Sequence, residues 1–112
     1  KLYSEVEITL CKEQPFFGTQ TLQLLHLTQE TGSLLAACRP VGISYSKGRG
    51  MIAAAEAQLG GALLARQQGG ASGGSSVVTA RGAQLMQCYR AYCDAVQASA
   101  RELFGIYFPE EA

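Results

Sequence analysis

The stretch GSLLAACRPVGISYSKGRGMIAAAEAQLG, residues 32–60, decides the fold. Serine readily caps a helix N-terminus, so Ser33 and Ser44 predict helices from residue 34 to about 39 and from 45 to about 59. Pro40 lacks a backbone N–H and its ring clashes with the preceding turn, so the first of these helices should end or distort there. Gly42 makes the turn between them. Residues 33–60 therefore have the pattern of a helix-turn-helix.

The second of these helices has two distinct faces on a wheel of about 100° per residue. The apolar face carries Gly48, Met51, Ile52, Ala55 and Leu59, and the opposite face carries Ser46, Gly50, Ala53 and Ala57. Lys47 and Arg49 lie on the two flanks. A helix in the major groove needs small or polar residues centrally and cations near the phosphates, so we predict that this helix binds DNA. The alternative is an ordinary surface helix, because Gly50 and Ala53 have no side chain that could hydrogen-bond a base.

The segments before residue 32 predict a strand and a helix. Residues 3–10 alternate between polar and apolar side chains, which indicates a half-buried strand. Pro15 should break any continuation of it. Residues 19–31 predict a core helix with a broad apolar face, closed by Gly32 in the left-handed conformation. His26 lies beside that face and is expected to be a structural residue and not a ligand or a base.

The segments after residue 60 predict a hairpin. Residues 63–66 and 76–78 read as short strands, and the loop between them is rich in glycine and serine. Such a loop is typical of a flexible hairpin tip. Following a helix-turn-helix, a hairpin at 63–78 would be a wing, whose glycine amides can donate to phosphates. The alternative is a mobile hairpin without a partner. The loop is not a phosphate-binding P-loop, because no Gly-Lys-Ser/Thr follows it.

Thr79 is expected to cap a last helix over residues 80–107. At about 1.5 Å per residue this helix would be about 40 Å long, which is longer than a small domain needs. Its apolar positions recur at close to heptad spacing, so we predict that it pairs with its equivalent in a homodimer. The predicted dimer interface residues are Leu85, Tyr89, Tyr92, Val96, Leu103 and Tyr107. The alternative is a helix packed wholly on its own domain.

The composition is that of one globular domain spanning residues 1–112, with 47% hydrophobic and 16% charged residues. No apolar run reaches the roughly 18 residues of a membrane span, and no signal peptide is expected. Cys11, Cys38, Cys88 and Cys93 form no Cys-x-x-Cys pair, so we expect neither a metal site nor a disulfide framework. Reduced thiols favour a cytoplasmic protein, and no cofactor is expected.

The formal net charge is 0, but the basic residues gather in the centre of the chain. Between Arg39 and Arg90 the only acidic residue is Glu56, whereas the other acids lie towards the two ends. A locally basic region is the electrostatic footprint of nucleic-acid binding. The alternative is an ordinary mixed surface.

One set of motifs runs through nearly the whole chain. It comprises Phe16-Phe17-Gly18, Thr31-Gly32-Ser33-Leu34, Ala36-Ala37-Cys38-Arg39, residues 42–47, Ala55-Glu56, Leu59-Gly60, residues 63–66, residues 78–82, Leu103-Phe104 and Tyr107-Phe108. Together these motifs resemble the N-terminal DNA-binding domain of bacterial molybdate-responsive transcription regulators, which is similar to the LysR-type winged helix. The resemblance implies a mainly α winged helix-turn-helix with small β elements. A three-helix core would carry the hairpin wing, the N-terminal strand and a long C-terminal dimerisation helix.

The resemblance also implies a homodimer held by the first strand, the first helix and the last helix. The third helix would enter the major groove of double-stranded DNA, and the wing would lie on the backbone or the minor groove. The predicted DNA-contacting residues are Ser33, Ser44, Tyr45, Ser46, Lys47, Arg49, Arg66, Gly70, Ser72 and Arg81. After residue 47 the family continues with Ala-Trp, whereas this chain has Gly48-Arg49-Gly50. Full-length members carry molybdate-binding domains, but no such domain or molybdate site is expected in these 112 residues.

We therefore expect a dimeric DNA-binding transcriptional regulator. An enzyme is not expected, because no nucleophile and base, metal-ligand cluster or paired carboxylates stand at a usable spacing. The alternative is a diverged dimerisation or protein-interaction module that does not bind DNA, which the neutral net charge and the bare face of the third helix favour.

Overall fold

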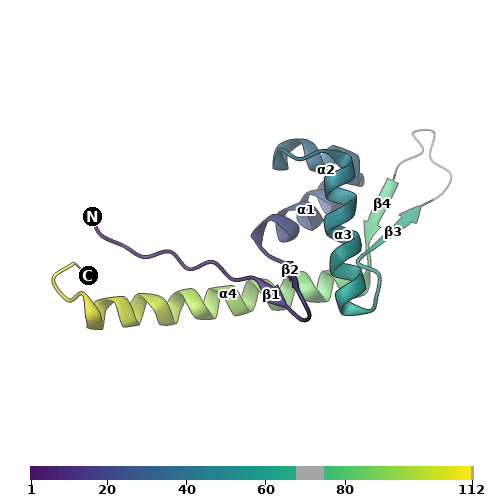
Figure 1. The fold of residues 1–112 in the computed structure, drawn as a ribbon. Coiled ribbons are helices and arrows are strands. Elements are labelled where there is room, and N and C mark those ends of the chain that lie inside the picture. Colours follow the sequence, from purple (N-terminus) through teal and green to yellow (C-terminus); the bar gives the residue numbers. More distant parts are fainter. Residues whose placement is uncertain (68–74, 112) are drawn as a thin grey trace.

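Four helices and two short antiparallel hairpins form the described part of the chain, residues 1–67 and 75–111 of a computed structural model (Figure 1). In chain order the elements are β1 (Leu10–Cys11), β2 (Pro15–Phe17), α1 (Thr19–Thr31), α2 (Leu34–Val41), α3 (Tyr45–Leu59), β3 (Leu64–Gln67), β4 (Ser75–Val78) and α4 (Ala80–Tyr107). This architecture agrees with the coarse fold class predicted from the sequence, mainly α with small β elements. Within the described residues, no helix is both long and apolar enough to cross a membrane.

Side-chain caps set the start of three helices where the sequence predicted them. The hydroxyl of Ser33 accepts a hydrogen bond from the backbone N–H of Ala36 (3.1 Å), and that of Ser44 accepts one from Lys47 (3.0 Å). Thr79 caps α4 in the same way. Each cap satisfies one of the backbone donors that the first turn of a helix leaves without an intrahelical partner.

Left-handed glycines end the first three helices. The φ angles are 74° at Gly32, 81° at Gly42 and 71° at Gly60. Side chains are strained in this conformation and glycine is not, so these three residues fix how tightly α1, α2 and α3 can follow one another. The glycine closure of α1 and the turn at Gly42 were both predicted.

The predicted end of α2 was wrong by two residues, because the helix continues through Pro40 to Val41. Pro40 lies in the last turn, where its missing N–H removes only one intrahelical bond. The backbone N–H of Gly42 then donates to the carbonyls of Cys38 (3.0 Å) and Arg39 (3.1 Å), which closes the turn after the proline.

The predicted strand at residues 3–10 was also largely wrong. Only its end pairs, because β1 lies antiparallel to β2 with Leu10 opposite Phe17. The strand β1 ends at Cys11, before Pro15, and Pro15 begins β2. Residues 3–9 run as an extended segment beside α4 (Figure 1). Side chains of α4 hold this segment, since Tyr89 Oη donates to the carbonyl of Ile8 (2.6 Å) and Gln97 Nε2 donates to that of Val6 (2.8 Å).

The alternation that suggested the strand is nevertheless present. Val6, Ile8 and Leu10 are half-buried, whereas Glu5, Glu7 and Thr9 are exposed. The alternating pattern therefore predicted correctly which side chains are buried. It did not predict strand pairing, because residues 3–9 have no partner strand in the described part of the chain.

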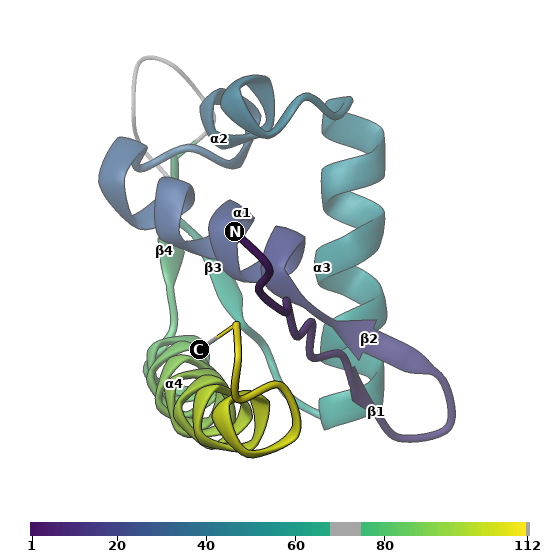
Figure 2. The same cartoon turned by 90° about the vertical axis from the view of Figure 1, so that its left-hand side faces the viewer.

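The core lies where α1, α2 and α3 meet the first half of α4. Its largest fully buried side chains include Phe17, Leu24, Leu25, Leu63 and Met86. Figure 2 shows α1 between α3 and the β3–β4 hairpin, with α4 beneath them. The helices α2 and α3 approach closely at Gly48, where an added Cβ atom would lie 2.5 Å from the sulfur of Cys38.

Tyr89 corrects one prediction about the dimer interface. We expected its side chain to face a partner chain, but it is only 3% exposed within its own chain. Its ring packs edge-on against Phe17, with the ring centroids 5.1 Å apart. Heptad spacing alone could not tell a position that faces the chain's own core from one that faces a partner.

The second half of α4 extends beyond the core with residues 1–9 alongside it, and the described chain measures 59 × 28 × 21 Å (Figure 1). We call this part, residues 1–9 and 90–111, the arm. Its large exposed apolar side chains are Leu2, Tyr3, Tyr92, Leu103, Ile106, Tyr107 and Phe108. Of the remaining predicted interface residues, Leu85 and Val96 are half-buried.

Candidate nucleic-acid interface

The outer face of α3 is exposed and nearly free of large side chains. Ser46, Gly50, Ala53 and Ala57 are all exposed. The opposite face is in the core, where Gly48, Ile52 and Ala55 are buried. The division into two faces that the sequence predicted is therefore confirmed.

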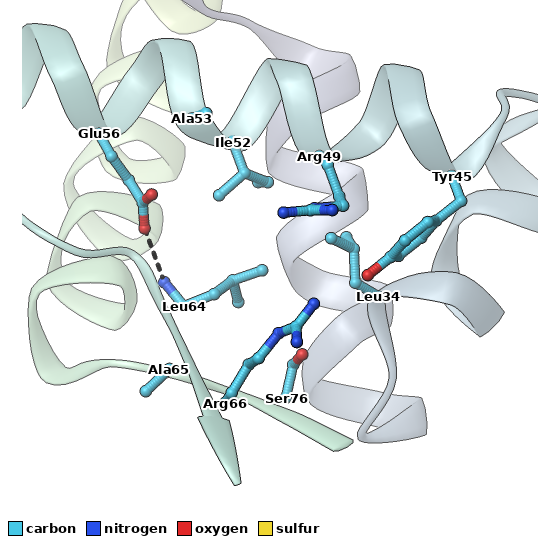
Figure 3. A pocket seen from close by; sticks show the side chains of 10 residues that line it. All are labelled: Leu34, Tyr45, Arg49, Ile52, Ala53, Glu56, Leu64, Ala65, Arg66 and Ser76. Carbon is cyan, nitrogen blue, oxygen red and sulfur yellow. Dashed lines mark hydrogen bonds between the residues drawn. The ribbon is translucent and has the colours of Figure 1, made fainter. Parts of the chain in front are cut away.

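The two cations of α3 flank this face on different sides. Arg49 turns towards the β3–β4 hairpin, and its guanidinium carbon lies 5.8 Å from the centre of the Tyr45 ring (Figure 3). A guanidinium over an aromatic face is attracted by the ring's quadrupole, so Tyr45 helps to hold Arg49 in place. Lys47 is exposed and lies two positions earlier, which places it on the other flank of the helix.

A hollow lies between α3 and the β3–β4 hairpin, and side chains from α3 and from both strands line it, among them three predicted residues. Tyr45 and Arg49 line it from α3, Arg66 from β3 and Ser76 from β4. Figure 3 shows the side chains of Arg49 and Arg66 reaching into it from opposite walls, with the Ser76 hydroxyl beside Arg66. A second hollow continues from it along the start of α2 and reaches Ser33.

The position of the β3–β4 hairpin is set in part by the turn that joins α1 and α2. The backbone N–H of Ser76 donates to the carbonyl of Gly32 (2.8 Å), which ties β4 to the turn between α1 and α2. The strands pair from Leu64 opposite Val78 to Gln67 opposite Ser75, within one residue of the predicted strands. Arg66 lies opposite Ser76, so it projects from a part of the hairpin that is fixed to the turn between α1 and α2.

Among the described residues, Glu56 is the only acidic side chain that lines this hollow, and it accepts hydrogen bonds from the backbone. Its Oε2 atom accepts hydrogen bonds from the N–H groups of Leu63 (2.8 Å) and Leu64 (3.3 Å), the second of which is drawn in Figure 3. It therefore connects α3 to the start of β3. One carboxylate faces the guanidinium groups of Arg49 and Arg66, so the charged side chains lining the hollow sum to +1.

No other acidic residue stands near this site in the sequence, because residues 31–93 contain none besides Glu56. Within the described residues, the one ion pair joins His26 Nε2 and Glu30 Oε1 at 3.7 Å, and it lies on α1. The charged side chains that line the hollow therefore keep a net positive charge.

Arg81, another predicted DNA-contacting residue, lies away from this cluster. Arg81 donates from its guanidinium to the carbonyl of Leu59 (3.3 Å), at the far end of α3. At about 1.5 Å per residue, that end is about 22 Å from the helix start. Arg81 thus neutralises the negative end of the α3 dipole. Gly70 and Ser72 lie outside the described residues.

Two participants were missed by the sequence analysis. Ser76 offers a hydroxyl to the hollow, but a serine at the start of a strand has no distinguishing sequence signal. Glu56 did carry a signal, since a lone acid in a basic stretch is unusual. In the sequence it is only an exception to the charge pattern. In the structure it is a hydrogen-bond acceptor that connects α3 to the hairpin.

The cysteines do not gather into a site. Cys38 is buried, and this burial raises the pKa of its thiol. Cys11 and Cys88 are exposed, and Cys93 is half-buried. Among the described residues there is no group of three or more His, Cys, Asp or Glu side chains that could hold a metal ion.

No protein-family model matches the chain, and no curated protein matches its sequence.

Proposed function

We propose that this protein is a dimeric, DNA-binding transcription regulator of the winged helix-turn-helix type. The observation that carries the proposal is the exposed, small-residue face of α3, which stands next to Arg49 and Arg66 in a hollow with excess positive charge. Small residues let a helix approach base edges, and cations beside it meet the phosphates.

In this proposal α2, Gly42 and α3 form the helix-turn-helix, and α3 enters the major groove. Ser44 and Ser33 are already caps, so their hydroxyls are engaged with backbone N–H groups at the helix starts. Ser46 and Lys47 are exposed at the first turn of α3 and approach the bases and the backbone. The β3–β4 hairpin is the wing, and contacts from Gly70 and Ser72 remain a prediction.

The arm supplies the second half of the proposal, a homodimer. Leu103 is 51% exposed and Tyr107 is 74% exposed, and these two residues lie four apart on one face of α4. Exposed apolar side chains that gather on one projecting segment mark an interaction surface. A second copy of the same chain provides a symmetric cover for them.

The experiment that tests DNA binding is fluorescence anisotropy of a labelled duplex, titrated at several salt concentrations. Wild-type protein should bind with an affinity that falls as salt rises, since each neutralised phosphate contributes about −0.9 to the log–log slope. A Lys47→Ala, Arg49→Ala double variant should bind roughly tenfold more weakly or worse. Lys12→Ala is the control, because it removes an exposed cation from the segment between β1 and β2, outside the arm.

A second candidate is a diverged dimerisation or protein-interaction module that does not bind DNA. The observation that favours it is the same face of α3, since Gly50, Ala53 and Ala57 carry no side-chain hydrogen-bonding group. Absence of wild-type binding at low salt, or a flat salt response, would exclude the DNA-binding proposal and leave this candidate.

A further inference from the structure

We propose that Arg49 and Arg66 bind one and the same phosphate group, in the hollow between α3 and the β3–β4 hairpin. Resting on the proposed function, the inference assigns that phosphate to a phosphodiester of the DNA backbone. The hollow would then be a clamp through which α3 and the hairpin hold a single point on one strand.

The first argument is the convergence of the two side chains. Arg49 comes from α3 and Arg66 from β3, and both guanidinium groups point into the same hollow (Figure 3). Guanidinium groups present planar N–H donors that suit the tetrahedral oxygens of a phosphate. The centre of the Tyr45 ring lies 5.8 Å from the guanidinium carbon of Arg49 and the ring helps to hold this side chain, and the Ser76 hydroxyl adds a polar group beside Arg66.

The second argument is the charge. Two guanidinium groups that face one hollow repel each other, although solvent weakens this repulsion at exposed side chains, and an anion between them replaces it with attraction. Glu56 offsets only part of the charge, because it supplies one carboxylate against two guanidinium groups. No other acidic side chain of the described residues lines the hollow, so an anion bound by both arginines would come from another molecule.

The third argument is the size of the hollow. Its volume is about 190 Å³, and the second hollow, of about 640 Å³, continues from it along the start of α2. The apolar side chains of Leu34 and Ile52 form part of its lining. The space therefore suits one phosphate group whose remaining substituents extend along the second hollow, as those of a backbone phosphodiester would.

The test is the salt dependence of duplex binding by wild-type protein, Arg49→Ala, Arg66→Ala, the double variant and the Lys12→Ala control. If both arginines hold one phosphate, the log–log slope of the double variant is less negative than that of the wild type by about 0.9. Each single variant should already show most of this change in slope, because one guanidinium alone does not complete the clamp. A slope that is less negative by about 1.8 in the double variant means that the two arginines bind two separate phosphates, and it overturns the proposal. An unchanged slope in the double variant overturns it as well, while leaving DNA binding through other residues intact.

A second measurement separates failure of the clamp from failure of the proposed function. If wild-type protein binds no duplex, its melting temperature is compared in inorganic phosphate and in sodium chloride at equal ionic strength. Stabilisation by phosphate that disappears in both single variants keeps the clamp, as a site for free phosphate. No stabilisation of the wild type, or stabilisation that persists in either single variant, overturns it. Circular dichroism of each variant establishes that the fold is retained.

Discussion

Gly48→Ala should destabilise the protein even though it places a better helix former in the middle of α3. Alanine in a helix interior is favoured over glycine by about 1 kcal/mol. At this position, however, the added Cβ atom would lie 2.5 Å from the sulfur of Cys38, and contacts below 3.0 Å are essentially never seen. Cys38 is only 2% exposed, so its sulfur has no solvent to move into.

The magnitude follows from setting these two effects against each other. Overpacking a well-filled core costs about 1–3 kcal/mol. A middle value of about 2 kcal/mol, less the gain of about 1 kcal/mol in helix propensity, leaves a loss of about 1 kcal/mol. For a chain of this size, that corresponds to a fall in the melting temperature of roughly 4 °C.

Removing the sulfur should reverse the sign of the effect. In a Cys38→Ala background, the nearest remaining neighbours of the new Cβ are Ile43 and Leu24, each at 3.6 Å, which is ordinary contact. Gly48→Ala should then stabilise by up to about 1 kcal/mol. The coupling free energy between the two sites is therefore about 2 kcal/mol, which is in the range expected for residues in contact.

The assay is urea-induced unfolding followed by circular dichroism, for the four proteins of this double-mutant cycle. Gly50→Ala is the matched control, because an added Cβ there meets nothing within 4 Å, and it should stabilise by up to about 1 kcal/mol. If Gly48→Ala stabilises the wild type as much as Gly50→Ala does, α2 and α3 do not pack at this point. The position of α3 would then have to be explained in another way.

Two further predictions concern the hairpin and the arm. Glu56→Ala should destabilise by about 1–3 kcal/mol in thermal melts, because the part-buried N–H groups of residues 63 and 64 lose their acceptor. Glu56→Gln keeps an acceptor and should lose clearly less; equal losses would contradict this role. Asp substitutions at Leu103 and Tyr107 should convert a dimer to a monomer in sedimentation velocity, because both side chains are exposed on the arm. Gln87→Asp, on the exposed surface of the first half of α4, should not do so. A wild-type monomer, or a dimer that survives the substitutions, would refute the proposed arm interface.

Features that depend on nearby residues could be predicted from the sequence. The bounds of α1, α3 and α4 agree with the prediction because they rest on local signals, namely the caps at Ser44 and Thr79 and the left-handed glycines. The two faces of α3 follow from helical geometry alone. Pro40 shows the limit of a local rule, since the hydrogen bonds of Gly42 allow the last turn of α2 to form around it.

Features that depend on distant residues could not be predicted in this way. Residues 3–9 alternate as a strand does, but strand formation needs a hydrogen-bonding partner that a sequence pattern does not identify. Tyr89 fits the heptad pattern of α4 equally well in its own core and in an interface. The arginines illustrate the same point, because Arg66 turns towards Arg49 while Arg81 turns to the end of α3, and no spacing distinguishes the two.

The proposed DNA-binding surface and the proposed dimer surface lie at opposite ends of the elongated molecule (Figure 1). This separation determines how far apart two α3 helices would lie in a dimer. At about 1.5 Å per residue, residues 90–107 extend about 27 Å. If two arms overlap along this length, the two cores lie at opposite ends of the pair, and each α3 lies farther out within its own core (Figure 1). Helix-turn-helix dimers place their recognition helices about 34–36 Å apart, one turn of the duplex. Because Arg81 holds the end of α3 at the first turn of α4, each α3 end lies about 14 Å beyond residue 90, and fully overlapping arms would separate the two α3 ends by roughly 55 Å along the arm. A spacing of one duplex turn therefore requires the two arms to cross near the cores instead of overlapping along their whole length.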